Sequence, residues 1–378
     1  KHNTLKNNII KLSASDISSK EIISVNKVLK NQYLGMGKMV LNFEKKLESF
    51  FGSYVACTVN GTAALHLALQ AAGIKRNDEV LVPSVTYVAS LQSITATGAK
   101  PVICDININD GLISLDDAKK KISKKTKAIM PVYFAGYPGE INKIYKFASQ
   151  HKLKVIEDAA HAFGSRYNKK KVGSIGDFVC FSFDGIKNIT SGEGGCVVSQ
   201  NKNIINKIKD LRLLGVVRDS IKRYKGDKSW VYNVKEQGWR YHMSDIMASI
   251  GLVQLKRFSE LSKKRKNLAK HYDFLFKEID WVETVRFNTE QVVPHIYVIK
   301  IKKKFNKKKL IEYFKKSKIE IGLHYYPTHK IRFFNKSLTS KCPNSEEFYK
   351  HALTLPLNTR ITKNDINFVV KKLEEFFN

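Results

Sequence analysis

Long apolar runs are missing from this sequence. In its 378 residues there is no stretch of about 18 or more apolar residues, the length that a membrane-spanning helix needs. The first residues, KHNTLKNNII, also lack the apolar segment of a signal peptide. We therefore expect a soluble, cytoplasmic protein. The hydrophobic content of 43% is enough for a sizeable core, and the length favours a large domain with a smaller one.

Cysteine is also scarce. The number of cysteines is odd and none of them are spaced as Cys-x-x-Cys, which argues against a disulfide framework or a zinc site, and we expect no metal. The dinucleotide fingerprint G-x-G-x-x-G is absent after the first expected strands. The cysteines are expected to be small buried hydrophobic residues: Cys57, Cys104, Cys180, Cys196 and Cys342.

Acidic residues number only 34 against 66 lysines and arginines, giving a formal charge of +32. So basic a chain could bind nucleic acid, anionic lipid or phosphorylated metabolites. The lysines, however, are spread in short runs, and no arginine-rich block with interleaved aromatics stands out. We favour a solvated lysine-rich surface, with steering of a diphosphate substrate and nucleic-acid binding as the alternatives.

Short β-branched runs alternate with longer amphipathic stretches between about residues 20 and 250. This pattern predicts an α/β fold in which helices flank a mostly parallel sheet. Helices are expected at residues 62–72 and 140–151. The clearest strands are EVLVPS, KPVICD, AIMPVYF, KLKVIED, FVCFSF and GCVVS.

The sequence pattern changes near residue 250. A long Lys-rich helix is expected at residues 252–276, followed by a βαβ-like stretch of HIYVIKI, KKKLIEYFKKS and IEIGLHYYP and a last helix at residues 363–377. We therefore expect a large domain at residues 1–250 and a smaller α+β domain at residues 251–378.

The segment FSFDGIKNITSGEGGCVVS carries the strongest chemical signal. A strand ends at a hydroxyl residue, Lys187 follows in a loop, and a Gly-rich turn precedes the next strand. Such a loop can hold a lysine rigidly as a Schiff-base nucleophile, provided that its pKa is lowered. Taken alone, one lysine among many is more often an ordinary surface residue.

A second signal is VIEDAAHAFGS, in which an apolar strand ends at Glu157 and Asp158. Ligands bind at that edge of open α/β sheets, and a buried carboxylate there needs a cation such as a pyridinium nitrogen. Alternatively, Asp158 caps the following turn. His161 either lies against a cofactor ring or packs in the core.

A third signal is VNGTAALHLALQAAG, in which a strand leads into a helix that starts near Thr62. Exposed amides at a helix N-terminus, aided by the Thr62 hydroxyl, form an anion site suited to a phosphate, although a simple N-cap is the alternative. Tyr87, after the next strand, could stack on a flat heterocycle or pack in the core. The phosphate site, aromatic face, carboxylate and lysine together fit pyridoxal phosphate (PLP).

With these motifs in place, the sequence resembles the DegT/DnrJ/EryC1/StrS family of nucleotide-sugar aminotransferases, which have the fold type I of PLP enzymes. The resemblance extends from LGMGKMVLNFEKKL near residue 34 to LTLPLNTRITKNDI near residue 353, and EDAAHAFGS and FSFDGIKNITSGEGG are its specific parts. It implies a fold type I transferase with a large PLP-binding domain and a smaller C-terminal domain.

The resemblance also implies roles for individual residues. Lys187 would bond covalently to PLP and then shuttle a proton between the cofactor and the sugar carbon, while Asp158 would keep the pyridine nitrogen protonated. Tyr87 would stack on the ring, and His161 stands at a cofactor-adjacent position that is usually Gln or His. The phosphate would be held by Gly61, Thr62, the Ala63 amide and Ser182.

One segment departs from the family pattern. The family usually has GYNYRM or GFNYRM, whose Asn reaches the phosphate of the neighbouring subunit, whereas this chain has GWRYHM. Arg240 therefore stands at the Asn position and His242 at the usual Arg. Arg240 could serve the cofactor phosphate, the substrate diphosphate or a surface salt bridge.

In IGLHYYPTHKIRFF, which resembles the substrate-facing segment of the family, Tyr325 and His329 are candidates to touch the sugar, or else they pack between the domains.

The expected reaction transfers an amino group, by family analogy from L-glutamate, to a nucleotide-linked keto-sugar, making a deoxyamino sugar. The C4 ketone of a 4-keto-6-deoxy sugar is favoured because KNITSGEGG resembles C4-specific members. A C3 aminotransferase, a PLP lyase and a regulator on an inactive scaffold are the alternatives. The resemblance further implies a homodimer with shared active sites, and no nucleic-acid or membrane partner is expected.

Overall fold

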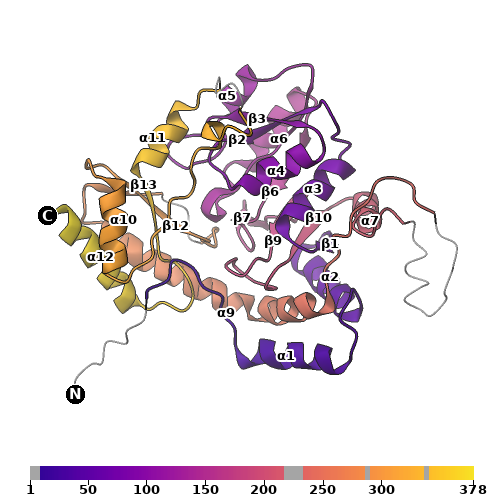
Figure 1. Ribbon diagram of the computed structural model, residues 1–378, viewed down its shortest axis with the longest axis horizontal. Coiled ribbons are helices and arrows are strands. Elements are labelled where there is room, and N and C mark those ends of the chain that lie inside the picture. The colour runs from indigo at the N-terminus through magenta and orange to yellow at the C-terminus, as the bar shows by residue number, and fades with distance from the viewer. Residues whose placement is uncertain (1–8, 217–232, 286–289, 336–339) are drawn as a thin grey trace.

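The computed structural model describes residues 9–216, 233–285, 290–335 and 340–378. Helices and strands of the N-terminal part occupy one side of the molecule, and the C-terminal elements lie on the other (Figure 1). The long helix α9 (Asp245–Phe276) runs beneath both parts. None of the helices in these ranges is long and apolar enough to cross a membrane.

Two adjoining four-stranded sheets form the centre. One is parallel throughout, in the order β3-β2-β4-β5, and the other has the order β1-β10-β9-β6, in which only the β6–β9 pair is parallel. The sheets meet because β5 and β6 belong to one stretch of chain, interrupted at Ile156. The strands are β1 (Tyr54–Thr58), β2 (Glu79–Pro83), β3 (Lys100–Cys104), β4 (Thr126–Ile129), β5 (Lys154–Val155), β6 (Glu157–Asp158), β9 (Val179–Ser182) and β10 (Gly195–Ser199).

Helices cover the faces of these sheets, as the α/β prediction requires, and the predicted fold class is confirmed. The helix α3 is apolar on all sides and is buried from residue 63 to residue 69, which is the pattern of a core helix. A small hairpin is formed by β7 (Arg166–Tyr167) and β8 (Lys170–Lys171). The helices are α1 (Ser19–Lys30), α2 (Lys38–Phe51), α3 (Gly61–Ala71), α4 (Val88–Ala96), α5 (Leu115–Lys120), α6 (Ile141–Gln150) and α7 (Lys202–Leu211).

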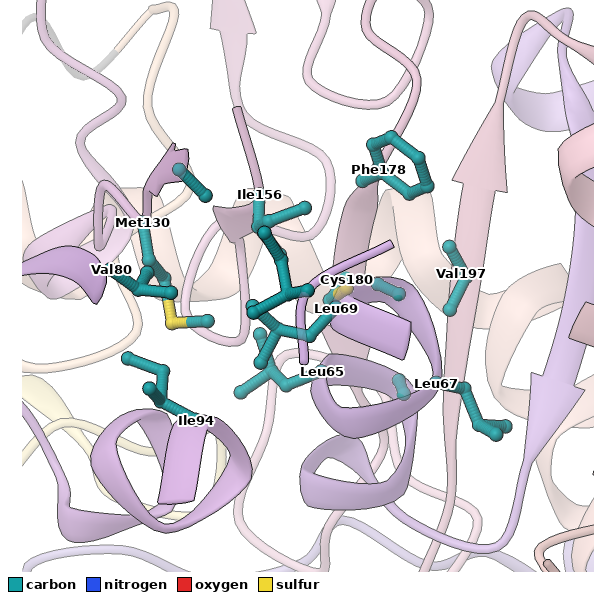
Figure 2. Packing of buried hydrophobic residues seen from close by; sticks show 14 of the residues in the cluster. Leu65, Leu67, Leu69, Val80, Ile94, Met130, Ile156, Phe178, Cys180 and Val197 are labelled. Atoms are coloured by element: carbon teal, nitrogen blue, oxygen red, sulfur yellow. The ribbon is translucent and has the colours of Figure 1, made fainter. Parts of the chain in front are cut away.

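The main hydrophobic core packs α3 against the sheet. Leu65 and Leu69 of this helix lie beside Ile156 and Cys180 of the strands (Figure 2). All five cysteines are free and buried, as expected from the sequence. This packing fixes the start of α3 against the ends of β1 and β9, where the functional residues lie.

The C-terminal part contains the antiparallel sheet β11-β12-β13, formed by β11 (Val282–Thr284), β12 (Tyr297–Ile301) and β13 (Ala352–Leu355). It is packed with α10 (Lys307–Lys316), α11 (Pro343–His351) and α12 (Lys363–Phe377). The predicted domain boundary at residue 250 falls inside α9, and the division into residues 1–250 and 251–378 stays a prediction.

The βαβ-like prediction for the C-terminal part is wrong in its second strand. Residues 319–327 form only isolated bridges, Ile10 with Ile319 and Gly322 with Thr354. Beyond Gly322 the chain leaves the sheet and carries His324 and Tyr325 to the cavity described below. The partner of β12 is instead β13, from much later in the sequence.

Candidate active site

A cavity of about 480 Å³ opens where the central strands end. β6 ends at Asp158, β9 ends at Ser182, and β1 leads into the start of α3, so three strands of one sheet deliver side chains to this cavity. Eight of the predicted site residues line this cavity: Gly61, Thr62, Tyr87, Asp158, His161, Ser182, Lys187 and Tyr325.

Lys187 lies in a tight loop between β9 and β10. Its amide donates to the Asp184 carbonyl at 3.0 Å, and the Ser191 amide closes the loop by donating to the Phe183 carbonyl at 2.8 Å. Burial lowers the pKa of the Lys187 amine, while Asp184 and Asp158 oppose this change. A lysine with a lowered pKa has more of the neutral, nucleophilic amine at neutral pH.

Asp158 is a buried carboxylate, only 6% exposed. It accepts hydrogen bonds from the Ser90 hydroxyl at 2.7 Å and from the Ala160 amide at 3.2 Å, and the Thr86 hydroxyl lies 2.7 Å from that of Ser90. Burial raises the pKa of Asp158. Among the described residues no salt bridge neutralises this carboxylate, so it is suited to a cationic ring nitrogen of a bound molecule.

The start of α3 and the end of β9 approach each other closely. A Cβ atom on Gly61 would lie 2.8 Å from the Ser182 Cβ, so only glycine permits this approach. Contrary to the N-cap alternative at Thr62, the cap is Asn60, whose side chain accepts from the Ala63 amide at 2.8 Å. The Gly61 backbone and the Thr62 and Ser182 hydroxyls are therefore placed for an anion, whereas the Ala63 amide already has a protein partner.

Aromatic and imidazole side chains also line the cavity. Tyr87 is 61% exposed at the start of α4, and its ring centroid lies 6.1 Å from that of Tyr325. The Tyr325 hydroxyl lies 3.1 Å from Nε2 of His161. Burial lowers the pKa of His161 well below its usual value, so its ring is neutral. An exposed tyrosine face at a cavity mouth is available for stacking on a planar ligand.

Three predicted residues do not line the cavity. Ala63 lies behind Gly61 in α3, and Arg240 is exposed, in a bridge with Leu213. His329 is buried, with Nδ1 2.7 Å from the Ser84 hydroxyl and Nε2 3.1 Å from Glu346. Both ring nitrogens of His329 are thus occupied within the chain, which favours the alternative that it packs between the two parts.

The structure also adds residues that the sequence did not single out for the site. Asn60, Thr86, Asp184, Glu193 and His324 line the cavity. Burial lowers the pKa of His324 to about 4, and its Nδ1 lies 2.9 Å from the Thr354 hydroxyl. The Asn60 cap could have been found from the sequence, because asparagine directly precedes the helix. His324 could not, because a tertiary turn alone brings it to the cavity.

A loop lysine, a buried carboxylate without a cation and a glycine-lined helix start, all on one α/β sheet edge, define a site for a PLP enzyme of fold type I. The chain belongs to the DegT/DnrJ/EryC1/StrS aminotransferase family, whose model matches residues 15–374. The resemblance drawn from the sequence is thereby confirmed, and the chain is a PLP-dependent sugar aminotransferase.

Two curated relatives illustrate the similarity. The chain is 34% identical over 369 residues to the UDP-4-amino-4,6-dideoxy-N-acetyl-beta-L-altrosamine transaminase of Campylobacter jejuni, covering 96% of each chain. It is 32% identical over 365 residues to the GDP-perosamine synthase of Escherichia coli O157:H7, again covering 96% of each.

Solved structures agree with this assignment. Helicobacter pylori PseC, an aminotransferase involved in the biosynthesis of pseudoaminic acid, matches with a TM-score of 0.89 at 27% identity, covering 97% of this chain and 99% of that one. A Streptococcus pneumoniae protein provisionally named as a sugar aminotransferase, solved in its PLP form, matches with a TM-score of 0.88 at 28% identity, covering 96% and 97%.

Proposed function

We propose that this enzyme transfers an amino group from L-glutamate to the C4 ketone of a 4-keto-6-deoxy sugar linked to a nucleoside diphosphate. The observation that carries this proposal is that Lys187, Asp158 and the start of α3 at Gly61 and Thr62 line one cavity. PLP supplies an aldehyde that condenses with amines and a protonated ring that withdraws electrons from the neighbouring carbon.

Lys187 is proposed as the covalent attachment point and as the proton carrier. Burial lowers the pKa of its amine, which favours the neutral form that attacks an aldehyde. The same Nζ, when not bonded to the cofactor, would accept a proton from the substrate carbon and return it. The short turn to Asp184 restricts where this nitrogen can reach.

Asp158 is proposed to hold the ring nitrogen in its protonated form. The carboxylate already has two donors, the Ser90 hydroxyl to Oδ2 and the Ala160 amide to Oδ1, and together they fix its orientation. A cationic ring nitrogen would compensate the desolvation that raises the pKa of Asp158. Ser90 is therefore proposed as the residue that orients this carboxylate.

The phosphate is proposed to lie between Gly61 and Thr62 on one side and Ser182 on the other. The Ala63 amide was expected in this set, and it would join only by exchanging its bond to Asn60. Tyr87 would stack on the ring, with His161 beside it. Tyr325 is proposed to face the sugar, since it lines the cavity, whereas His329 would act only by supporting the segment that carries Tyr325.

A homodimer with shared sites is proposed on two grounds. Among the described residues that line the cavity, Lys187 is the one lysine or arginine, while Asp158, Asp184 and Glu193 are acidic. A diphosphate substrate needs more cations than this, and the exposed Arg240 of a partner subunit could supply one. Apolar side chains are also exposed on α1 and α2 and in the adjoining segments, which favours burial against a second copy: Ile17, Ile22, Ile23, Leu29, Tyr33, Leu34 and Leu41.

The C4 position is supported by resemblance. The segment KNITSGEGG, which forms the Lys187 loop, resembles that of C4-specific members, and the Campylobacter jejuni relative is named for a 4-amino-4,6-dideoxy sugar. Glutamate as the donor rests on the family alone. A C3 ketone remains the rival acceptor.

The test is to incubate the purified enzyme with PLP, nitrogen-labelled glutamate and a panel of 4-keto and 3-keto nucleotide sugars. The proposal expects labelled nitrogen on C4, located by NMR of the product. Label on C3 would replace the C4 proposal with the C3 one. Loss of the sugar hydroxyl without incorporation of label would indicate a lyase and refute aminotransfer.

A further inference from the structure

A buried guanidinium lies behind the Lys187 loop, and the proposed reaction assigns it no part. Arg265 of α9 is 3% exposed. In the described part of the chain no carboxylate pairs with it, because Asp16 is bound by Arg257 at 2.7 Å instead. Burial lowers the pKa of Arg265 to about 10, and the nearby Asp16 opposes this change without pairing with the guanidinium, so Arg265 is a costly buried cation.

Arg265 instead binds three backbone carbonyls. It donates to the carbonyls of His295 at 3.1 Å, Leu357 at 3.2 Å and Ile186 at 3.5 Å. Ile186 directly precedes Lys187, so the guanidinium reaches the Lys187 loop from α9. The same side chain thus joins the lysine loop to two segments from the C-terminal part.

Arg265 and Lys187 also share a second, very small cavity of about 10 Å³ on the inner side of the loop. This volume is at the lower limit of what one water molecule needs. Little solvent therefore screens the guanidinium from the lysine, and the charge of Arg265 acts on Lys187 through protein.

We propose that Arg265 is a positioning residue, which holds a positive charge behind the Lys187 loop and thereby favours the neutral amine of Lys187 facing the main cavity. This inference rests on the proposed role of Lys187. The described titratable and charged groups that share a cavity or interact with Lys187 are Asp16, Tyr87, Asp158, His161, Asp184, Glu193, Arg265, His295, His324 and Tyr325.

These groups do not act in the same direction. Burial lowers the pKa of Lys187, Asp184 and Asp158 raise it, and Arg265 lowers it again. The histidines are neutral because burial lowers the pKa of each. Arg265 therefore adds to the effect of burial, and together they act against the two carboxylates, which favour the ammonium form of Lys187.

The experiment measures the ionisation of Lys187 directly, without using catalysis. Full-length protein freed of PLP is acetylated with trace reagent over a range of pH, and labelling of Lys187 is quantified by peptide mass spectrometry against the exposed Lys143. One buried unit charge is expected to change a neighbouring pKa by about one unit, which is a factor of ten. In Arg265→Gln, which keeps amide donors but loses the charge, the titration midpoint should rise, and labelling at neutral pH should fall about tenfold.

Arg265→Lys, which keeps the positive charge but loses the planar set of guanidinium donors, should leave the titration midpoint of Lys187 near that of the wild type. A midpoint unchanged in Arg265→Gln, or moved equally in both variants, would refute the proposal and leave Arg265 with a purely structural role. Arg265→Met replaces the Gln variant if circular dichroism shows that the latter is misfolded. Failure of the proposed function itself is seen separately, as absence of a cofactor adduct on Lys187 in the wild type.

Discussion

Ser90→Ala tests whether the hydrogen bond to Asp158 matters for the chemistry. The Ser90 hydroxyl is fully buried and donates to Asp158 at 2.7 Å, so its removal leaves the carboxylate with the Ala160 amide as its remaining donor among those described. Ser90 does not line the main cavity. An effect on the reaction must therefore pass through Asp158.

The size of the effect follows from the strength of a hydrogen bond to a charged group, about 1.5–3 kcal/mol, or roughly one to two pKa units. Burial already raises the pKa of Asp158, and Ser90 opposes it. The variant should therefore raise this pKa further. Because the ring nitrogen needs an ionised partner, the acid limb of the pH profile should move to higher pH, and the rate below it should fall about tenfold or more.

The assay is stopped-flow measurement of the glutamate half-reaction across the acid limb. Ser93→Ala is the matched control, since the Ser93 hydroxyl, also buried on α4, donates to the Ser90 carbonyl at 2.8 Å and not to Asp158. The reasoning is refuted if Ser90→Ala leaves the acid limb in place, or if both variants move it equally.

Gly61→Ala should weaken PLP binding about tenfold or more, measured by fluorescence titration, because the new Cβ would lie 2.8 Å from the Ser182 Cβ. Arg212→Met should lower the free energy of unfolding by about 3 kcal/mol in urea denaturation, because it removes the buried cation at 2.5 Å and leaves Glu44 with the partly exposed Lys209 at 3.2 Å. Glu21→Gln should reduce the loss of stability between about pH 4.5 and 2, measured by thermal unfolding. Burial raises the pKa of Glu21, but its hydrogen bonds outweigh burial and lower the pKa to about 2. Because the pKa of Glu21 is lower in the folded than in the unfolded protein, its ionised form stabilises the fold at pH values above the unfolded pKa. This stability is lost as the pH falls through the folded pKa.

Three controls separate these effects from general damage. Gly35→Ala introduces a Cβ with no atom within 4 Å, so PLP affinity should not change. Lys143→Met breaks an exposed ion pair with Glu140 and should leave the free energy of unfolding essentially unchanged. Glu312→Gln, at an exposed position of α10, should leave the acid dependence intact. Equal losses in a variant and its control would contradict the corresponding prediction.

The sequence predicts those parts of the fold and of the site that depend on local sequence patterns. The strands that deliver Asp158 and Ser182 and the glycine-rich loop of Lys187 were visible because burial, strand ends and glycines have local signatures. Ser90 was not recognised as part of the site, because a serine inside a helix shows its partner only once β6 packs beside α4.

Tertiary context also explains where the predictions and the structure differ. IGLHYYP has the composition of a strand, yet it pairs with β13 only at Gly322 before turning to the cavity. The segment around His329 resembles a substrate-facing segment and made this residue a candidate to touch the sugar. Its two ring nitrogens instead lie within hydrogen-bond distance of Ser84, 245 residues away in the chain, and of Glu346 on α11. Such long-range partners leave no periodic trace in a sequence.

The central claim is that Lys187 carries the cofactor. Borohydride reduction of the PLP-loaded enzyme, followed by peptide mass spectrometry, locates the attachment directly. The account predicts a single pyridoxyl-modified lysine at position 187, and its loss in Lys187→Ala. A stoichiometric adduct on a different lysine, or none on the folded and PLP-saturated wild type, would contradict it.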